Sequence, residues 1–342
     1  MDKSINWIIT GMLPSGHKGM IASAEGGCKT TLLSWVAICI TLGYPLFDMP
    51  VKQGKVLMID EETPYDSLKR KLDRFALSFK LKGIQDIPNL TLLSKGGFRF
   101  SRKNKEIIDV VKEQAPTLIT IDTVLACLPS GRQGLEENNS NTGIAIRDDL
   151  DTLLQASLGS AILIAAHSGK STSNYEIEDY RKAEMRTLVR GHGSITGEAC
   201  DTGYGLLKIT ENPILRFALI PKPRREAISM VETYIEMKEQ TYGEGWAKLE
   251  KIEPVPTPPS RPAIDLSSIF LSSEKNELEA KDIRQKASAL YTPGEIRLGL
   301  DQLRRRKVIV TTKDSFTFKL NPKVEEEADS QYINQLLSPQ NV

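Results

Sequence analysis

Short apolar runs alternate with longer segments of helical periodicity through roughly the first 250 residues, and this alternation limits the possible folds. The runs are almost continuously apolar, which is typical of strands buried on both faces of a parallel sheet. Strands separated by helices predict an α/β fold with a mostly parallel central sheet. The predicted strands are Gly19–Ala24, Lys55–Asp60, Leu118–Asp122 and Ala161–Ala166, and the predicted helices are Lys29–Leu42, Tyr65–Phe79 and Gly143–Leu158.

The composition is that of an ordinary globular protein. The chain has 342 residues, of which 40% are hydrophobic, with 45 Lys+Arg against 44 Asp+Glu. This length predicts about two domains, and the balanced charge means that any DNA-binding face must be local. The 4 cysteines form no CxxC pair, which favours reduced thiols in a cytoplasmic protein over a disulfide scaffold or zinc site. No signal peptide and no membrane span are predicted.

A proline-rich segment divides the chain. Residues 251–262 (KIEPVPTPPSRP) are too rich in proline for an interior helix or a central strand, so they predict a semi-rigid linker. The linker would join a domain of residues 1–250 to a smaller domain of residues 263–322. An acidic tail, residues 323–342, is predicted to be flexible.

The smaller domain has the predicted element order of a winged helix: two short helices, a third helix and two short strands. The third helix is predicted to begin at Pro293 after the N-cap Thr292, and the strands are Val308–Thr312 and Ser315–Leu320. In winged helices such a third helix commonly enters the DNA major groove, although others only contact proteins. The candidate DNA-binding residues are Arg297, Arg304, Arg305 and Lys313.

The strongest chemical signal is the segment Ser23–Thr30 (SAEGGCKT), between a predicted strand and a predicted helix. Backbone N–H groups, a lysine and a hydroxyl at this spacing are typical of a loop that binds nucleotide phosphates, with the hydroxyl on Mg²⁺. The consensus glycines correspond to Ser23 and Cys28, and an ordinary glycine-rich turn is the alternative. The candidate ATP-binding residues are Glu25, Gly26, Gly27, Cys28, Lys29, Thr30 and Thr31.

Carboxylates end two of the other predicted strands. Glu61 and Glu62 follow one strand and Asp122 ends another, where a carboxylate can activate water or hold Mg²⁺. Each acid alone could instead cap a helix. The three elements together predict a nucleoside triphosphate site in which Thr30 and Asp122 bind the metal.

The segments VLMIDEETP, LITIDTV, LEENNS at residues 135–140, and ILIAAHSGK followed by RGHGSITGEACD carry a resemblance to a known family. Residues from about 10 to 225 resemble the RepA-type (AAA_25) RecA-like P-loop ATPases, which are relatives of DnaB-type helicases, KaiC and RadA. The resemblance implies that Glu62, or else Glu61, activates the attacking water. It also implies that Asp122 is the Walker B acid and that Asp201 is structural.

The resemblance further implies that His167 senses the γ-phosphate, although it could simply be a polar residue at a strand end. It implies a ring, in which a cationic side chain from a neighbouring subunit, such as an arginine finger, completes the site. Arg190 is the first candidate and Lys170 the second. The basic stretch 170–190 would face DNA in the ring channel or be a solvated loop. Its candidate DNA contacts are Lys170, Arg181, Lys182 and Arg186.

These features predict an ATP- and Mg²⁺-dependent DNA-binding motor, assembled as a homo-oligomeric ring and helicase-like rather than a full replicative helicase. It would be a hexamer that serves replication of a plasmid, phage or mobile element. The first alternative is an ATP-switched regulator or target-selection protein that binds duplex DNA. The second is a KaiC-like ATPase whose ring contacts a protein.

Overall fold

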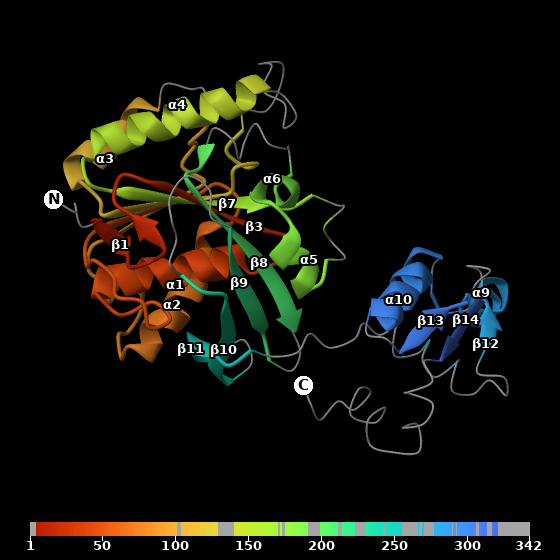
Figure 1. Cartoon of the computed structure of the whole chain (residues 1–342). Coiled ribbons are helices and arrows are strands. Elements are labelled where there is room, and N and C mark those ends of the chain that lie inside the picture. Colours follow the sequence, from red (N-terminus) through yellow and green to blue (C-terminus); the bar gives the residue numbers. More distant parts are fainter. Residues whose placement is uncertain are drawn as a thin grey trace. The chain divides into compact units, whose positions relative to one another are not determined.

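A computed structural model of the chain (Figure 1) divides into two compact units, Met1–Pro254 and Val255–Val342, each treated by itself below. The structure describes residues 5–100, 104–128, 140–169, 172, 175–190, 199–210, 214–222, 230–241, 244–254, 266, 269, 277–288, 290–291, 293–305, 308–312 and 317–320.

The first unit is built on a 9-stranded sheet with the order β11-β10-β9-β8-β3-β7-β6-β4-β5. The strands from β8 to β5 in this order are parallel, and β8, β9, β10 and β11 pair in antiparallel fashion. The predicted α/β class with a mostly parallel sheet is therefore confirmed. The strands are β3 (Lys18–Ser23), β4 (Val56–Asp60), β5 (Leu90–Ser94), β6 (Leu118–Asp122), β7 (Ala161–His167), β8 (Thr202–Thr210), β9 (Arg216–Lys222), β10 (Thr233–Thr241) and β11 (Glu244–Ile252).

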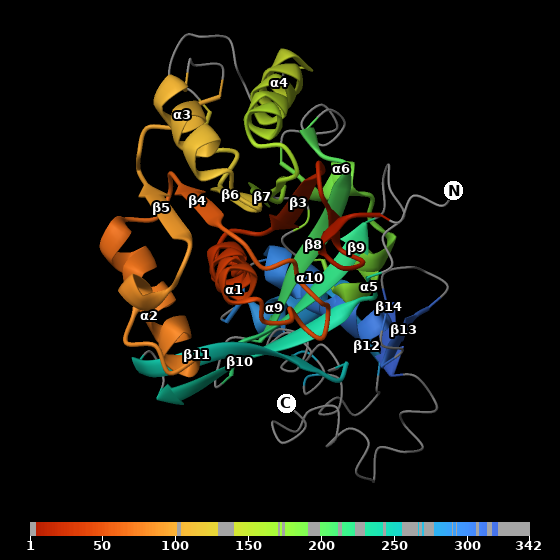
Figure 2. The same ribbon diagram turned by 90° about the vertical axis from the view of Figure 1, so that its left-hand side faces the viewer.

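Helices cover both faces of the parallel strands, with α1 and α2 on one side and α3 and α4 on the other (Figure 2). This explains why β3, β4 and β6 are buried along their whole length. The helices are α1 (Lys29–Leu42), α2 (Tyr65–Ser78), α3 (Lys105–Gln114), α4 (Ser140–Ala156), α5 (Ile177–Lys182) and α6 (Met185–Leu188), with a 3₁₀ turn, η1 (Ile84–Asp86), and a small hairpin of β1 (Trp7–Ile9) and β2 (Leu13–Pro14).

Helix α1 is apolar on nearly all sides because it lies between the sheet and α2. Helix α2 is amphipathic and buries Leu68, Leu72 and Phe75, which follow the helical period. Its outer side contacts β11, because the antiparallel strands continue the sheet beneath α1 and α2 (Figure 2). The sheet therefore brings β10 and β11 to the helix that follows the acidic strand end.

Two sequence expectations differ from the structure. The stretch expected to be a loop near residues 170–190 contains the short helices α5 and α6, and α5 carries a capping box of Glu176 and Asp179. The predicted linker was placed from residue 251, but β11 extends to Ile252 by pairing with Tyr234. In both places hydrogen bonds that the local composition does not reveal decide the structure.

In the second unit, α9 (Ala280–Ala287) and α10 (Pro293–Arg305) accompany a 3-stranded antiparallel sheet of order β12-β14-β13. Helix α10 begins at Pro293, the residue expected from sequence. Strands β13 (Ile309–Thr311) and β14 (Thr317–Leu320) lie within the expected ranges, and β12 (Glu277–Glu279) was not expected. Of the first predicted helix only Leu266 and Ile269 lie in the described part, so the winged helix stays a prediction.

Among the helices that the structure describes, none combines the length and the apolar character that crossing a bilayer requires.

Candidate active site

The chemically important side chains lie at the carboxyl ends of neighbouring parallel strands. The register of β3 and β7 places Ser23 beside His167, and the register of β4 and β6 places Asp60 beside Asp122. In open α/β sheets this edge is where ligands bind. Residues that are distant in the chain are thereby brought to one edge.

The loop between β3 and α1 is closed by its own hydrogen bonds. Ser23 Oγ donates to the carbonyl of Gly27 at 3.1 Å, and the Gly27 N–H donates to the carbonyl of Ala24 at 3.0 Å. Gly26 has a φ of +69°, which glycine adopts without strain. A Cβ at Gly27 would lie 1.9 Å from Ser23 Oγ and 2.8 Å from the carbonyl oxygen of Ala24, so the loop would have to shift to hold a side chain there. Ser23, at a consensus glycine position, thus ties the loop together.

Cys28 is the last loop residue and the N-cap of α1. It adopts a φ of 68°, in the left-handed region that costs a non-glycine residue of the order of 1 kcal/mol. The first backbone N–H groups of α1, which follow Cys28, point out of the helix end because no carbonyl of the preceding turn is available to them within the helix. The helix end can therefore bind a phosphate.

Lys29, at the start of α1, has a buried side chain that points back over the loop. Its Nζ donates to the carbonyl oxygens of Ala24 at 3.0 Å and Ser23 at 3.4 Å. Burial lowers the pKa of this lysine, and the nearby carboxylates of Asp122 and Glu62 oppose that shift. The ammonium group is thus held at the loop by backbone carbonyl oxygens, and the carboxylates of Asp122 and Glu62 lie near enough to affect its pKa.

Thr30 and Asp122 form a pair suited to a divalent cation. Thr30 Oγ1 donates to Asp122 Oδ2 at 2.5 Å. In the described part of the structure, Asp122 Oδ1 and Asp60 Oδ2 are buried and lack a hydrogen-bond partner. Burial, reinforced by the charge of Asp60, raises the pKa of Asp122 to about 6. Hydroxyl and carboxylate oxygens with unmet bonding capacity fit Mg²⁺, which prefers oxygen ligands.

Glu62 faces the same space from the loop after β4. Its Oε2 accepts a hydrogen bond from Thr123 Oγ1 at 3.1 Å and lies 3.4 Å from His167 Nε2. His167 Nδ1 in turn lies 3.4 Å from Lys29 Nζ. The contact with His167 is the main cause of a lowered pKa at Glu62, so this carboxylate stays ionised. An ionised, half-exposed carboxylate can accept a proton from water.

Glu61 has a different environment and is buried. Its Oε1 accepts from the Phe98 N–H at 3.0 Å, and its Oε2 pairs with Arg99 Nη1 at 2.6 Å. Both oxygens are thus engaged in fixing the segment after β5. Of the two glutamates, Glu62, the first candidate from the sequence, lines the cavity, and the alternative Glu61 does not.

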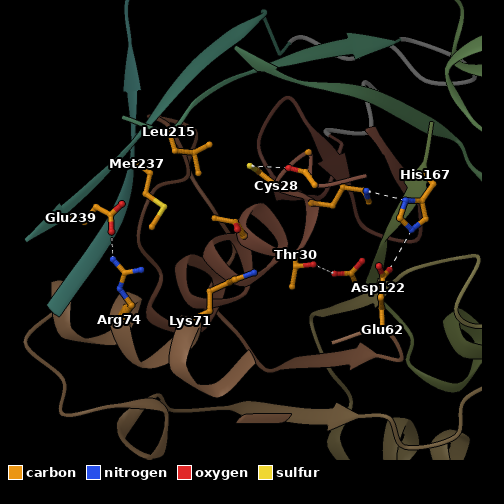
Figure 3. A pocket seen from close by; sticks show the side chains of 14 residues that line it. Cys28, Thr30, Glu62, Lys71, Arg74, Asp122, His167, Leu215, Met237 and Glu239 are labelled. Atoms are coloured by element: carbon orange, nitrogen blue, oxygen red, sulfur yellow. Dashed lines mark hydrogen bonds and ion pairs between the residues drawn. The ribbon is translucent and has the colours of Figure 1, made fainter. Parts of the chain in front are cut away.

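One cavity of about 480 Å³ joins these groups (Figure 3). The predicted site residues that line it are Gly26, Gly27, Cys28, Lys29, Thr30, Thr31, Glu62, Asp122 and His167. Glu25 is exposed and does not line it. The sequence analysis missed several lining residues, because α2 and the antiparallel strands bring them to the loop only in the folded chain. Two of them, Lys71 and Arg74, lie on α2, and the basic face of this predicted helix was the only hint of them in the sequence. The missed lining residues are Lys71, Arg74, Leu215, Met237 and Glu239.

Lys71 is the missed lining residue that interacts with the acidic groups of the site. Burial lowers the pKa of its ammonium group, and the carboxylates of Asp122 and Asp60 oppose the shift. Figure 3 shows its side chain reaching from α2 towards the start of α1. A second lysine is thus available to an anion in this cavity.

The residues expected to bind DNA have varied environments. Arg181 pairs with Glu178 and Glu232, whereas Lys182 is exposed and Arg186 pairs with Glu184 at the surface. Arg190 is exposed, and its N–H donates to the carbonyl of His167 at 2.8 Å. In the second unit Arg297 and Arg304 are exposed. Lys170, Lys313 and the side chain of Arg305 lie outside the described residues, as do residues 135–139.

Asp201, which the resemblance suggests is structural, lies just before β8, and its Oδ2 accepts a hydrogen bond from the Lys18 N–H at 2.9 Å. This contact ties the start of β8 to the start of β3.

The fold and the cavity define a P-loop ATPase with a RecA-like α/β core. The chain belongs to the AAA_25 family, whose model, described as an AAA domain, matches residues 2–173. The resemblance seen in the sequence is therefore confirmed. Among curated proteins, none matches this chain.

Several solved structures are similar to this chain. A KaiC-like protein, PH0186 from the archaeon Pyrococcus horikoshii OT3, is 14% identical with a TM-score of 0.48, over 72% of this chain and 93% of that one. The RadB recombinase is 15% identical with a TM-score of 0.45, over 70% and 93%. A third structure, an isolated ATPase domain, is 14% identical with a TM-score of 0.49, over 69% and 85%.

Proposed function

We propose that this protein is a Mg²⁺- and ATP-dependent DNA-binding motor, helicase-like and ring-forming, that acts in replication of a plasmid, phage or other mobile element. The observation that carries the proposal is the position of Glu62 in the cavity that also holds Lys29 and Asp122. A nucleotide-binding loop alone would serve a switch. An ionised carboxylate beside it supplies the base that repeated hydrolysis needs.

Each side chain then has a role in hydrolysis. Lys29 and the first N–H groups of α1 bind the phosphates, and Thr30 with Asp122 would hold Mg²⁺, which neutralises charge on the phosphates. Glu62 accepts a proton from the attacking water. His167 lies between Glu62 and Lys29, so it contacts both the base and the phosphate-binding cation.

The DNA-binding part of the proposal rests on exposed positive charge. Lys182 and Arg186 lie on the short helices α5 and α6, and Arg297 and Arg304 lie on α10. Side chains of this kind contact phosphates and give a salt-dependent affinity. Arg181 contributes less to this surface, because Glu178 and Glu232 neutralise it, and the pairing of Arg186 with Glu184 reduces its contribution in the same way.

Ring assembly would complete the site. Arg190 is exposed and does not line the cavity of its own chain, as expected of a residue that reaches the site of a neighbouring subunit. A trans-acting arginine can raise the rate of phosphoryl transfer by about 10³-fold or more.

Steady-state ATP hydrolysis tests the proposal, with the protein alone, with single-stranded DNA and with duplex DNA. We expect single strands to stimulate hydrolysis and Lys29→Ala to abolish it. Lys112→Ala, which removes an exposed lysine on α3, is the matched control and should behave like the wild type. Slow hydrolysis that single strands do not stimulate would contradict the motor.

The strained loop favours a second function, an ATP-switched DNA-binding regulator. Cys28 stands in a left-handed conformation where a glycine would be unstrained, which is tolerable in a slowly turning switch. In that case the full chain would bind duplex DNA tightly, and Arg297→Ala with Arg304→Ala would weaken the binding.

A further inference from the structure

The carboxylate of Glu62 meets the protein through one of its two oxygens. Oε2 accepts a hydrogen bond from Thr123 Oγ1 at 3.1 Å and lies 3.4 Å from His167 Nε2 (Figure 3). Within the described part of the chain no hydrogen bond reaches Oε1, and the Glu62 side chain is 48% exposed. The two oxygens therefore differ: Oε2 faces the protein and Oε1 is accessible to water.

Of the two contacts to Oε2, the one from Thr123 is the more constant anchor. It is the shorter contact, and a hydroxyl can donate to a carboxylate whatever the pH, whereas the imidazole donates only with a proton on Nε2. His167 also lies 3.4 Å from Lys29 Nζ, so its position depends on the lysine proposed to bind phosphate. Thr123 holds the carboxylate independently of that lysine.

Thr123 is itself fixed in the fold. It follows Asp122 at the end of β6 and is only 1% exposed. Its Oγ1 accepts a hydrogen bond from the Ala126 N–H at 3.4 Å, and its carbonyl accepts one from the Cys127 N–H at 3.1 Å. Because Oγ1 accepts from Ala126, its own proton is directed elsewhere and can be donated to Glu62.

The backbone of Glu62 is held against the same turn. Its N–H donates to Asp60 Oδ1 at 3.0 Å, and the neighbouring Glu61 N–H donates to the carbonyl of Asp122 at 2.8 Å. The main chain on both sides of the contact is thus fixed. The freedom that remains lies in the side-chain torsions of Glu62, and a contact at its carboxylate restricts them.

We propose that Thr123 is a positioning residue of the hydrolysis site, whose hydroxyl binds Oε2 of Glu62 and so turns Oε1 towards the attacking water. In the reaction the water oxygen bonds to the terminal phosphorus, the bond from that phosphorus to the ADP oxygen breaks, and a proton of the water passes to Oε1. A carboxylate that is displaced from the water slows this step and leaves nucleotide binding intact. The inference rests on the proposed hydrolysis and adds a residue that acts through Glu62.

Steady-state ATP hydrolysis and ADP binding by the full chain with Mg²⁺ test the inference. Thr123→Val keeps the shape of the side chain and removes the hydroxyl, so we expect kcat to fall by at least about tenfold while the Kd for ADP stays within about threefold of the wild type. Thr123→Ser keeps the hydroxyl and should retain at least about a third of the wild-type kcat. Thr41→Val, which removes a buried hydroxyl at the other end of α1, is the matched control and should behave like the wild type.

A role in packing alone would reverse the order of the variants, because serine leaves a small cavity and valine fills the site. A serine variant less active than the valine variant would therefore overturn the inference, as would a Thr123→Val protein with the wild-type kcat. A loss of about tenfold in Thr123→Ser would overturn it even where Thr123→Val does not fold. A wild type that does not hydrolyse ATP would overturn the proposed function and the inference with it.

Discussion

Glu62 and His167, 105 positions apart in the chain, lie with Oε2 of the glutamate 3.4 Å from Nε2 of the histidine. The other ring nitrogen of His167 lies at the same distance from Lys29 Nζ. The imidazole thus lies between the ammonium group proposed to bind phosphate and the carboxylate proposed to activate water. Both His167 and Lys29 act to lower the pKa of Glu62, and the contact with His167 has the larger effect.

His167→Ala should move the acid limb of the pH profile of kcat to higher pH. The histidine is the main cause of the lowered pKa of Glu62, so its removal raises that pKa and protonates the base at a higher pH. The measurement is kcat at saturating Mg²⁺ and ATP from about pH 3.5 to 7, which includes the range below the ordinary glutamate pKa of about 4.3. An acid limb at the wild-type position would show that the contact does not tune Glu62.

Glu62→Gln and Glu61→Gln should have opposite consequences. Glu62→Gln should lower kcat by about 10²-fold or more with ATP binding retained, because it removes the base and little packing. Glu61→Gln should mainly lower the thermal midpoint of unfolding, because a buried partner of Arg99 loses its charge. Hydrolysis rates, nucleotide affinity and thermal melts of both variants distinguish the roles, and a Glu61→Gln protein that is stable but inactive would reverse the assignment.

Asp122→Asn should stabilise the fold while it abolishes hydrolysis. Burial and Asp60 raise the pKa of Asp122 from 3.8 to about 6, so the charged form costs the folded state free energy. That cost is complete above about pH 6 and fades as the pH falls towards about 4, because the folded protein then binds the proton more readily than the unfolded chain. The variant should gain about 1–3 kcal/mol at about pH 7.5 in denaturant unfolding. A loss of stability at this pH would contradict the prediction.

Cys28 should be the thiol that a small alkylating reagent modifies first. It lines the cavity and is partly exposed, whereas Cys39, Cys127 and Cys200 are buried. Burial also raises the pKa of Cys39 and Cys127, which disfavours their reactive thiolates. Mass spectrometry after brief labelling locates the adduct, and bound ADP should slow its formation. Labelling of a buried cysteine first, or no protection by ADP, would contradict the geometry of the loop.

Sequence analysis alone identified four of the parallel strands, β3, β4, β6 and β7, and the order of the phosphate-binding elements along the chain, whereas the parallel strands β5 and β8 were not predicted. Apolar runs of strand length, a loop with Lys29 and Thr30, and acids after β4 and at the end of β6 are local features, and local periodicity and spacing reveal them. The family resemblance added Glu62 and His167 by position. For these elements the chain needs no distant contact to indicate its structure.

Contacts between distant parts of the chain establish that Glu62 rather than Glu61 lines the cavity, and that Arg74 and Glu239 line it as an ion pair. Glu61 and Glu62 are adjacent and chemically equal in sequence, and the contacts of Glu61 with Phe98 and Arg99 distinguish them. Arg74 meets Glu239 only because the antiparallel strands continue the sheet beneath α2. Such pairs, 165 positions apart, depend on strand register and sheet curvature, which periodicity does not encode.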